Sequence, residues 1–116
     1  MLPGARRLRR PAEFHAVFSS RARAATPSVV VHVARSAAEI PPESTRVGFV
    51  VSKKVGNAVQ RNRVKRRLRH MVPVQDTPFG ADVVVRALPP AATEPDRLAG
   101  DFANAWRRAF RKASPC

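Results

Sequence analysis

Nine lysines and arginines lie between Glu43 and Asp76, a stretch that contains no acidic residue. An arginine guanidinium is planar and can bind two phosphate oxygens at once or stack on an unpaired base. Like charges at i and i+4, such as Arg61 and Lys65, weaken an isolated helix by roughly 0.2–0.5 kcal/mol per pair, a cost that an external anion would relieve. The cluster therefore indicates a surface that binds a polyanion, with a solvated helix face as the alternative.

The whole chain shares this charge imbalance. Its 116 residues carry 22 lysines and arginines against 8 acidic residues, a formal net charge of +14. So large a charge repels itself, and nucleic acid is the partner it most favours. Binding to an anionic membrane would need a broad apolar helix face or an anchor, and neither is evident in the sequence.

Residues that could catalyse a reaction are scattered. The carboxylates form no metal-binding pattern, and His15, His32 and His70 lack the spacing of metal ligands. The one cysteine, Cys116, is the final residue, which fits a reducing cytoplasm. We expect a binding protein rather than a catalyst, and a free-standing ribonuclease is the alternative. Neither a secretory signal nor a membrane-spanning run is expected.

Hydrophobic periodicity predicts the elements that carry these residues. Pro11 and the apolar spacing that follows it predict a helix over about 11–22, and β-branched residues predict strands over 28–33 and 46–52. A third strand is expected over 82–86, followed by a turn over 88–92. A capping box at 93–96 would start a last helix with an apolar stripe made of Leu98, Phe102, Ala105, Trp106, Ala109 and Phe110.

The basic cluster itself falls on a predicted helix over 58–72, with Asn57 as its N-cap. Val64, Leu68, Met71 and Val72 form the stripe expected to face the core. The rest of the helix carries two basic ridges, which could meet two phosphate tracks. The first ridge comprises Arg61, Asn62, Lys65, Arg66 and Arg69, and the second comprises Arg63, Arg67 and His70.

The order α-β-β-α-β-α predicts a single α+β domain over 1–116, with a flexible basic arm at 1–10 and a tail at 113–116. The segment 46–69, RVGFVVSKKVGNAVQRNRVKRRLR, resembles the signature of the protein subunit of bacterial ribonuclease P, including its Arg-Asn-Arg element at 61–63. Phe14 and Phe18 look like the aromatic pair of that family's first helix, and 82–90 looks like its last strand and exit.

The resemblance implies an α-β sandwich of the ribosomal protein S5 domain 2-like type, with a small central sheet and a left-handed β-α-β crossover, although right-handed crossovers are the general rule. It also implies a ribonucleoprotein that removes the 5′ leader from precursor tRNA. Its catalytic RNA performs the chemistry with Mg2+ that the RNA holds, and one protein is expected per RNA. The protein would assist and would not cut.

Two groups of site residues follow from the resemblance, and the split between them follows from the helix ridges. A cleft for the single-stranded leader would comprise Phe14, Phe18, Val30, His32, Arg61, Asn62, Lys65, Arg66 and Arg69. Contact with the catalytic RNA would fall to Lys53, Lys54, Asn57, Arg63 and Arg67. Aromatic faces suit a leader because stacking contributes roughly 1–3 kcal/mol per base of any type.

Position 32 departs from the family, because similar proteins often have tyrosine there and this chain has no tyrosine. Histidine stacks more weakly. Ordinary core packing is the alternative role for Phe14 and Phe18. A basic ribosomal or RNA-chaperone protein is the alternative for the whole chain, and it differs in having no dependence on a tRNA leader.

Overall fold

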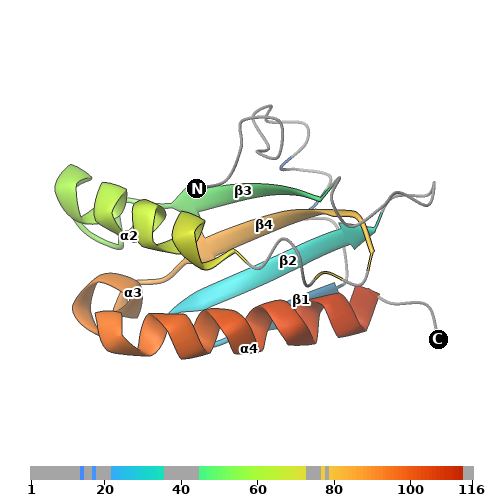
Figure 1. Cartoon of the computed structure of the whole chain (residues 1–116). Helices are drawn as coiled ribbons and strands as arrows, with labels where there is room; N and C mark the ends of the chain where they lie inside the picture. The colour runs from blue at the N-terminus through green and yellow to red at the C-terminus, as the bar shows by residue number, and fades with distance from the viewer. Residues whose placement is uncertain are drawn as a thin grey trace.

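The computed structural model describes residues 14, 17, 22–35, 45–72, 77 and 79–113. A four-stranded sheet is formed by β1 (Ala22–Ala25), β2 (Val29–Arg35), β3 (Arg46–Val51) and β4 (Ala81–Ala87). The helices of these ranges are α2 (Ala58–Met71), α3 (Pro90–Thr93) and α4 (Pro95–Ala113), arranged as Figure 1 shows. The expected α+β architecture is confirmed.

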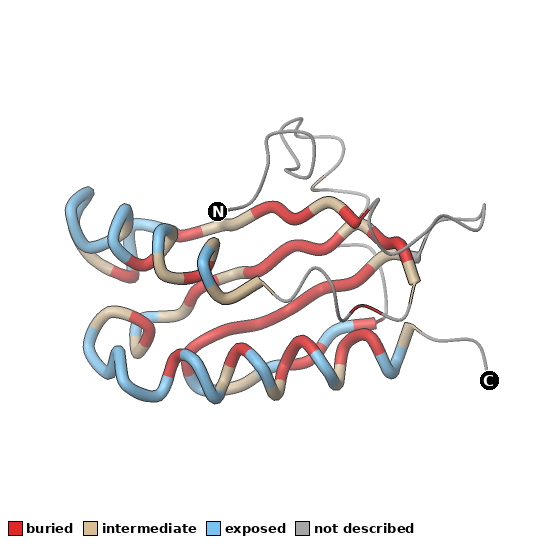
Figure 2. The backbone as a smooth tube through the Cα atoms, in the orientation of Figure 1, coloured by how far each residue is buried: buried red, intermediate tan, exposed pale blue. Residues whose placement is uncertain are grey.

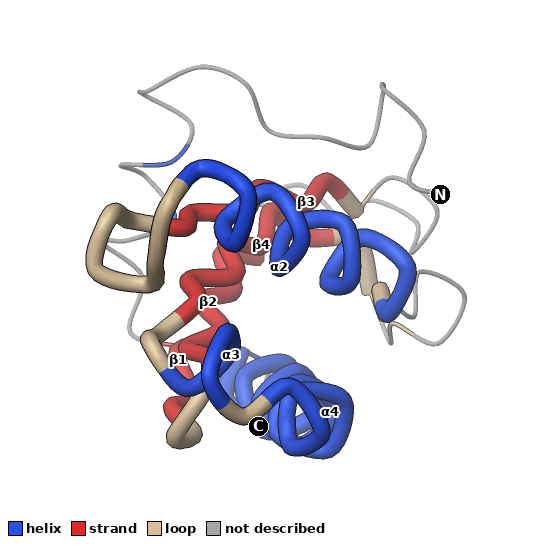
Figure 3. Tube along the Cα trace, turned by 90° about the vertical axis from the view of Figure 1, so that its left-hand side faces the viewer, coloured by secondary structure: helices blue, strands red, loops and turns tan. Residues whose placement is uncertain are grey.

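The sheet is mixed, and its spatial order is β1-β2-β4-β3. β2 pairs antiparallel with both β1 and β4, whereas β3 pairs parallel with β4. The parallel pair is joined through α2, and the path from β3 through α2 to β4 is left-handed (Figures 1 and 3). The uncommon hand that the resemblance implied is therefore present.

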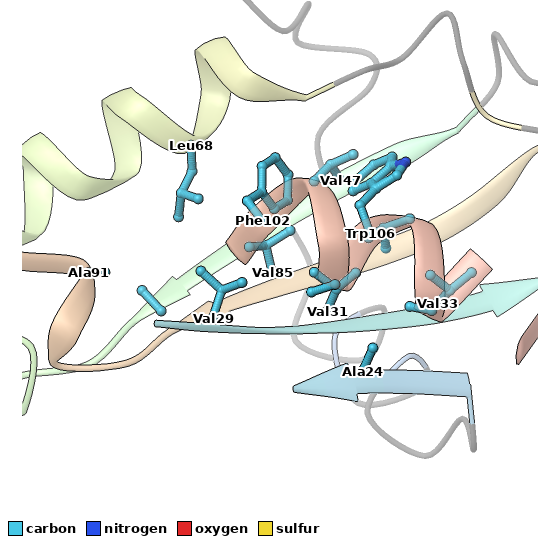
Figure 4. Close-up of a cluster of buried hydrophobic side chains, with 14 of the residues drawn as sticks. Ala24, Val29, Val31, Val33, Val47, Leu68, Val85, Ala91, Phe102 and Trp106 are labelled. Carbon is cyan, nitrogen blue, oxygen red and sulfur yellow. The ribbon is translucent and has the colours of Figure 1, made fainter. Parts of the chain in front are cut away.

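One face of the sheet holds the main core. Its valines, such as Val31 and Val85, pack against Leu68 of α2 and against Phe102 and Trp106 of α4 (Figure 4). Both long helices lie on this same side of the sheet (Figure 3). The apolar stripe predicted for the last helix is confirmed, because all six of its residues are buried.

The other face of the sheet carries a smaller apolar cluster. Val84 of β4 is fully buried there beside Val17, and Phe14 and Val50 pack around them half-buried. Phe14 and Val17 are in helical conformation. The remainder of the helix predicted over 11–22 lies outside the described residues, except for its last position.

At that last position the prediction is wrong, because Ala22 begins β1, a strand that was not expected. β1 is an edge strand of three alanines and Arg23, residues with weak strand preference, and pairing with β2 decides its structure. Two basic side chains of α4 cover this edge: Arg108 donates to the carbonyl of Ala25 at 3.2 Å and Lys112 to that of Arg23 at 2.7 Å. Edge carbonyls that would otherwise be open to another strand are thereby occupied.

Two smaller differences lie near the start of the last helix. The expected turn over 88–92 contains the short helix α3, and Thr93 is its last residue. The hydroxyl of Thr93 donates to the Pro89 carbonyl at 3.5 Å, a bond within α3 rather than a cap on α4. The predicted capping box therefore does not form, although α4 begins where it was expected, and Ala113, expected in the tail, closes α4.

Candidate nucleic-acid interface

The basic helix α2 begins with a reciprocal capping box. Gln60 N–H donates to Asn57 Oδ1, and Asn57 N–H donates to Gln60 Oε1, both at 2.9 Å. The predicted N-cap is confirmed. Gly56 precedes it closely: a Cβ at Gly56 would overlap the Gln60 side-chain amide, lying 2.8 Å from its Cδ. The first turn of the basic helix is thus fixed by three residues that carry no charge.

Only one side of α2 is covered by the protein. Val64 and Leu68 are buried against the sheet, and Met71 and Val72 pack half-buried beside them, so the predicted core stripe is confirmed. The opposite side faces outward, as the exposed colouring of α2 in Figure 2 shows. Val59 lies there 65% exposed.

Asn62 and the charged residues of α2 lie outside the core stripe, and some of them are partly covered. Asn62, Arg63 and Arg66 are exposed, and the half-buried group comprises Arg61, Lys65, Arg67 and Arg69. The ion pairs within the described ranges join Arg46 to Asp82 and Arg97 to Glu94 and Asp101, and none involves α2. The helix thus presents its positive charge without a carboxylate partner in this part of the chain.

Two arginines of the first ridge have a buried hydrogen-bond donor without an acceptor in the described part of the chain. The Nε atoms of Arg61 and Arg69 are buried from solvent, yet neither has a hydrogen-bond partner among the described residues. A buried donor without an acceptor costs about 1–3 kcal/mol. Phosphate oxygens would supply such acceptors, and guanidinium binds them well.

The second ridge lies beside the junction of α3 and α4. Arg63 and Arg67 line a pocket of about 80 Å³ together with Gln60, Val64, Ala92 and Pro95. This pocket is lined by two residues of the second ridge and by none of the first ridge. Lys53 and Lys54 are exposed in the turn that follows β3, and Asn57, also exposed, has its side-chain oxygen committed to the cap.

The uncharged part of the predicted cleft lies on the opposite face of the sheet. Val30 and His32 alternate on β2 with the valines of the main core, so they share a face with Val84 and with the Phe14 cluster. His32 is only 3% exposed. Phe18 lies outside the described residues.

The structure therefore brings the predicted site residues together in two sets rather than one. α2 packs on the main-core face, whereas Phe14, Val30 and His32 belong to the other face. A surface joining the two sets would pass around the β3 edge of the sheet.

Sequence reasoning missed two basic residues on the His32 face. Arg23 pairs directly with His32 across β1 and β2, and Arg86 of β4 pairs with Val30. Burial, then the charge of Arg86, then that of Arg23 lower the pKa of His32 below its ordinary value of 6.5, so the imidazole favours its neutral form. Strand alternation alone could have placed Arg86 on the face of Val84, but only the register brings it near His32.

Metal ligands do not cluster in the described part of the chain. Within those ranges no three His, Cys, Asp or Glu side chains gather in a way that could hold a metal ion. No helix among them is long and apolar enough to span a membrane.

Comparison with known proteins gives this arrangement a family. Residues 2–110 match the sequence model of the family described as Ribonuclease P. The ribonuclease P protein component of Kocuria rhizophila is 50% identical over 117 residues, covering 98% of this chain and 100% of the relative. That of Streptomyces bikiniensis is 47% identical over 116 residues, covering 93% of this chain and 94% of the relative.

Solved structures agree with the sequence relatives. The RNase P protein of Staphylococcus aureus superposes with a TM-score of 0.75 at 26% identity, covering 89% of this chain and 94% of that one. The RNase P protein of Thermotoga maritima gives a TM-score of 0.69 at 26% identity, over 84% and 92% of the two chains. On the family match and these likenesses, the chain belongs to the family of ribonuclease P protein components.

Proposed function

We propose that this chain is the RNA-binding subunit of ribonuclease P, which assists the catalytic RNA in removing the 5′ leader from precursor tRNA in the cytoplasm. The observation that carries the proposal is the outward side of α2, where basic side chains have no carboxylate partner in the described ranges. Membership of the ribonuclease P family supports RNA as the polyanion that this surface binds.

The site residues have two binding roles in this proposal, one toward the leader and one toward the catalytic RNA. In this proposal Phe14 and Phe18 stack on bases of the single-stranded leader, and the first ridge of α2 binds its phosphates. Val30 and His32 are 4% and 3% exposed, so they shape this face of the sheet without presenting a stacking surface of their own. Lys53, Lys54 and Asn57 join the second ridge in contacting the catalytic RNA. Arg63 and Arg67 are suited to one phosphate group of a folded RNA because both residues line the same pocket.

The protein's contribution is electrostatic and positional. Bringing a leader and a large RNA together concentrates phosphate charge, and the basic side chains of α2 offset that repulsion. Mg2+ that the RNA holds supplies the hydrolytic chemistry in this proposal, and the side chains of this chain bind and orient the RNA strands. Because each phosphate bound releases counterions, the affinity for RNA should fall with a log–log slope of about 0.7–0.9 per phosphate as salt rises.

Cleavage of precursor tRNA by a bacterial ribonuclease P RNA at low magnesium tests the proposal. Reactions are run with and without this protein, on substrates with long leaders and with very short leaders. Stimulation that requires the long leader supports the proposal. RNA binding without stimulation would instead support a ribosomal or RNA-chaperone role, and cleavage by the protein alone would indicate a free-standing nuclease.

A further inference from the structure

β1 is the outer strand of the sheet on the side away from β3. Successive residues of an antiparallel edge strand direct their backbone groups first toward the neighbouring strand and then away from it. Thr26 N–H donates to the carbonyl of Val29 at 2.8 Å across the turn between β1 and β2, which sets this alternation. Arg23 and Ala25 are therefore the residues of β1 whose N–H and C=O groups point away from β2.

Both of these outward carbonyls accept hydrogen bonds from side chains of α4. Arg108 Nη1 donates to the carbonyl of Ala25 at 3.2 Å, and Lys112 Nζ donates to that of Arg23 at 2.7 Å. Asn104 Oδ1 accepts from the same Nη1 at 3.0 Å and so holds the guanidinium of Arg108 in place. Four residues of a helix rise about 6 Å and two residues of a strand about 6.8 Å, so the two spacings match.

The neighbouring cations of α4 do not share this role. Arg107 and Arg111 are exposed, and in the described part of the chain neither guanidinium donates to β1 or joins an ion pair. Cations near a helix C-terminus stabilise the helix dipole, and these two positions can do so without touching the sheet. The contact with β1 is therefore a property of two positions and not of a basic helix end in general.

An edge strand with open backbone groups pairs readily with another strand. In the free protein the formal net charge of +14 keeps copies of the chain apart. In the proposed function, RNA bound at α2 neutralises part of this charge, so copies that gather on RNA lose part of that protection. A cover made of hydrogen bonds continues to act when the charge is neutralised.

We propose that the β1 edge is a strand-pairing site for a second copy of this chain, and that Arg108 and Lys112 hold it closed and keep the protein monomeric. In a two-fold antiparallel pairing centred on Ala24, Arg23 of one copy faces Ala25 of the other, and their outward N–H and C=O groups exchange hydrogen bonds. This site lies outside the RNA contacts of the proposed function. Only the RNA arm of the test below rests on that function.

The test compares two double variants of α4 by sedimentation velocity. The key variant combines Arg108→Ala with Lys112→Ala, and the matched control combines Arg107→Ala with Arg111→Ala, which removes two charges from the same helix. One arm uses the protein alone in high salt, which screens the repulsion between copies. The other adds the catalytic RNA of ribonuclease P. We expect dimers of the key variant in both arms, whereas the wild type and the control stay monomeric in salt and bind one per RNA.

Two further measurements show whether the association is strand pairing. The amide protons of Arg23 and Ala25 should exchange about tenfold more slowly in the associated key variant than in the monomeric wild type. Ala25→Pro, added to the key variant, removes an outward N–H that the fold does not use, a placement that edge strands tolerate. It should restore the monomer.

Each opposite outcome overturns the inference. Dimers of the wild type in high salt would show that the edge is not closed, and a folded key variant that stays monomeric would show that the cover is not needed. Equal association of the control, or association that persists with Ala25→Pro, would place the contact elsewhere.

Circular dichroism checks that each variant is folded. If the key variant does not fold, Lys112→Ala alone takes its place, because it opens one carbonyl from the last turn of α4 and should associate more weakly. A wild-type protein that does not bind the catalytic RNA would contradict the proposed function. The arm in high salt would still decide whether the β1 edge is held closed.

Discussion

Arg46 and Asp82 stand opposite each other in the parallel register of β3 and β4 and are joined by a two-point contact. Arg46 Nε donates to Asp82 Oδ1 at 3.0 Å, and its Nη2 donates to Oδ2 at 2.8 Å. These are the two strands that α2 connects, and the pair joins them near their first residues. Arg46 belongs to the acid-free stretch of the sequence, yet its charge is already matched within the fold.

The pair should therefore contribute to stability rather than to RNA binding. We expect Asp82→Asn or Arg46→Gln to lower the free energy of unfolding by about 1 kcal/mol, since the contact is bidentate but both side chains are about one-third exposed. In a double-mutant cycle followed by urea unfolding, the two losses should not add. Additive losses would show that the two residues act independently.

The close packing around Gly56 gives a second prediction. Gly56→Ala should destabilise the protein by about 1–2 kcal/mol, because the new methyl group displaces the Gln60 amide from the capping box of α2. RNA affinity should fall as well, since the first turn of the basic helix loses its fixed position. Thermal unfolding and RNA titration measure the two effects.

Gly100 provides the matched control for this substitution. It lies exposed within α4, and nothing would come within 4 Å of an added Cβ. Gly100→Ala should therefore stabilise the protein, by about 0.5–1 kcal/mol, through its better helix propensity. Opposite signs at the two glycines would show that the overlap with Gln60, and not the methyl group itself, causes the destabilisation at Gly56.

The basic surface of α2 gives a third prediction. Arg66→Ala should weaken precursor tRNA binding while the fold is retained, because Arg66 is exposed and shares no ion pair in the described ranges. Lys65→Ala should act in the same direction. The salt dependence should become shallower by roughly 0.7–0.9 in log–log slope for each phosphate that the variant no longer binds. Unchanged binding by both folded variants would remove these residues from the interface.

The elements that sequence predicted well are those in which local pattern and burial agree. α2 and α4 show a clear apolar stripe at helical spacing, and Val64 and Trp106 are buried as their spacing indicates. β1 was missed because its alanines have little strand preference, and only hydrogen bonds to β2, supplied by the fold, make it a strand. Local pattern carries no information on such pairing.

The site was predicted in the same uneven way. The charges of α2 could be assigned to an outward surface because the core stripe fixes the rotation of the helix. The charged neighbours of His32 could not be predicted from sequence, because Arg23 and Arg86 belong to strands far apart in sequence. The register of the strands brings both arginines near His32. The same holds for Arg46, whose partner Asp82 lies beyond the acid-free stretch.

His32 makes the stability of the fold depend on pH. Burial and the nearby arginines lower its pKa in the folded state, whereas the unfolded chain has the ordinary value of 6.5. As pH falls below that value, the unfolded chain takes up a proton that the folded protein resists, so the free energy of unfolding should decrease. The contribution is fully present above pH 6.5 and is lost on acidification toward the folded pKa, with a slope of at most about 1.4 kcal/mol per pH unit.

Urea unfolding between pH 7.5 and pH 5.0, as chosen conditions spanning roughly the histidine range, measures this dependence. His32→Phe keeps a flat ring and removes the titrating group, while His15 and His70 remain in both proteins. The variant should lose less stability on acidification than the wild type, whatever its stability at pH 7.5. Parallel curves for the two proteins would mean that His32 binds its proton equally well folded and unfolded, and that the arginines beside it exert no net effect.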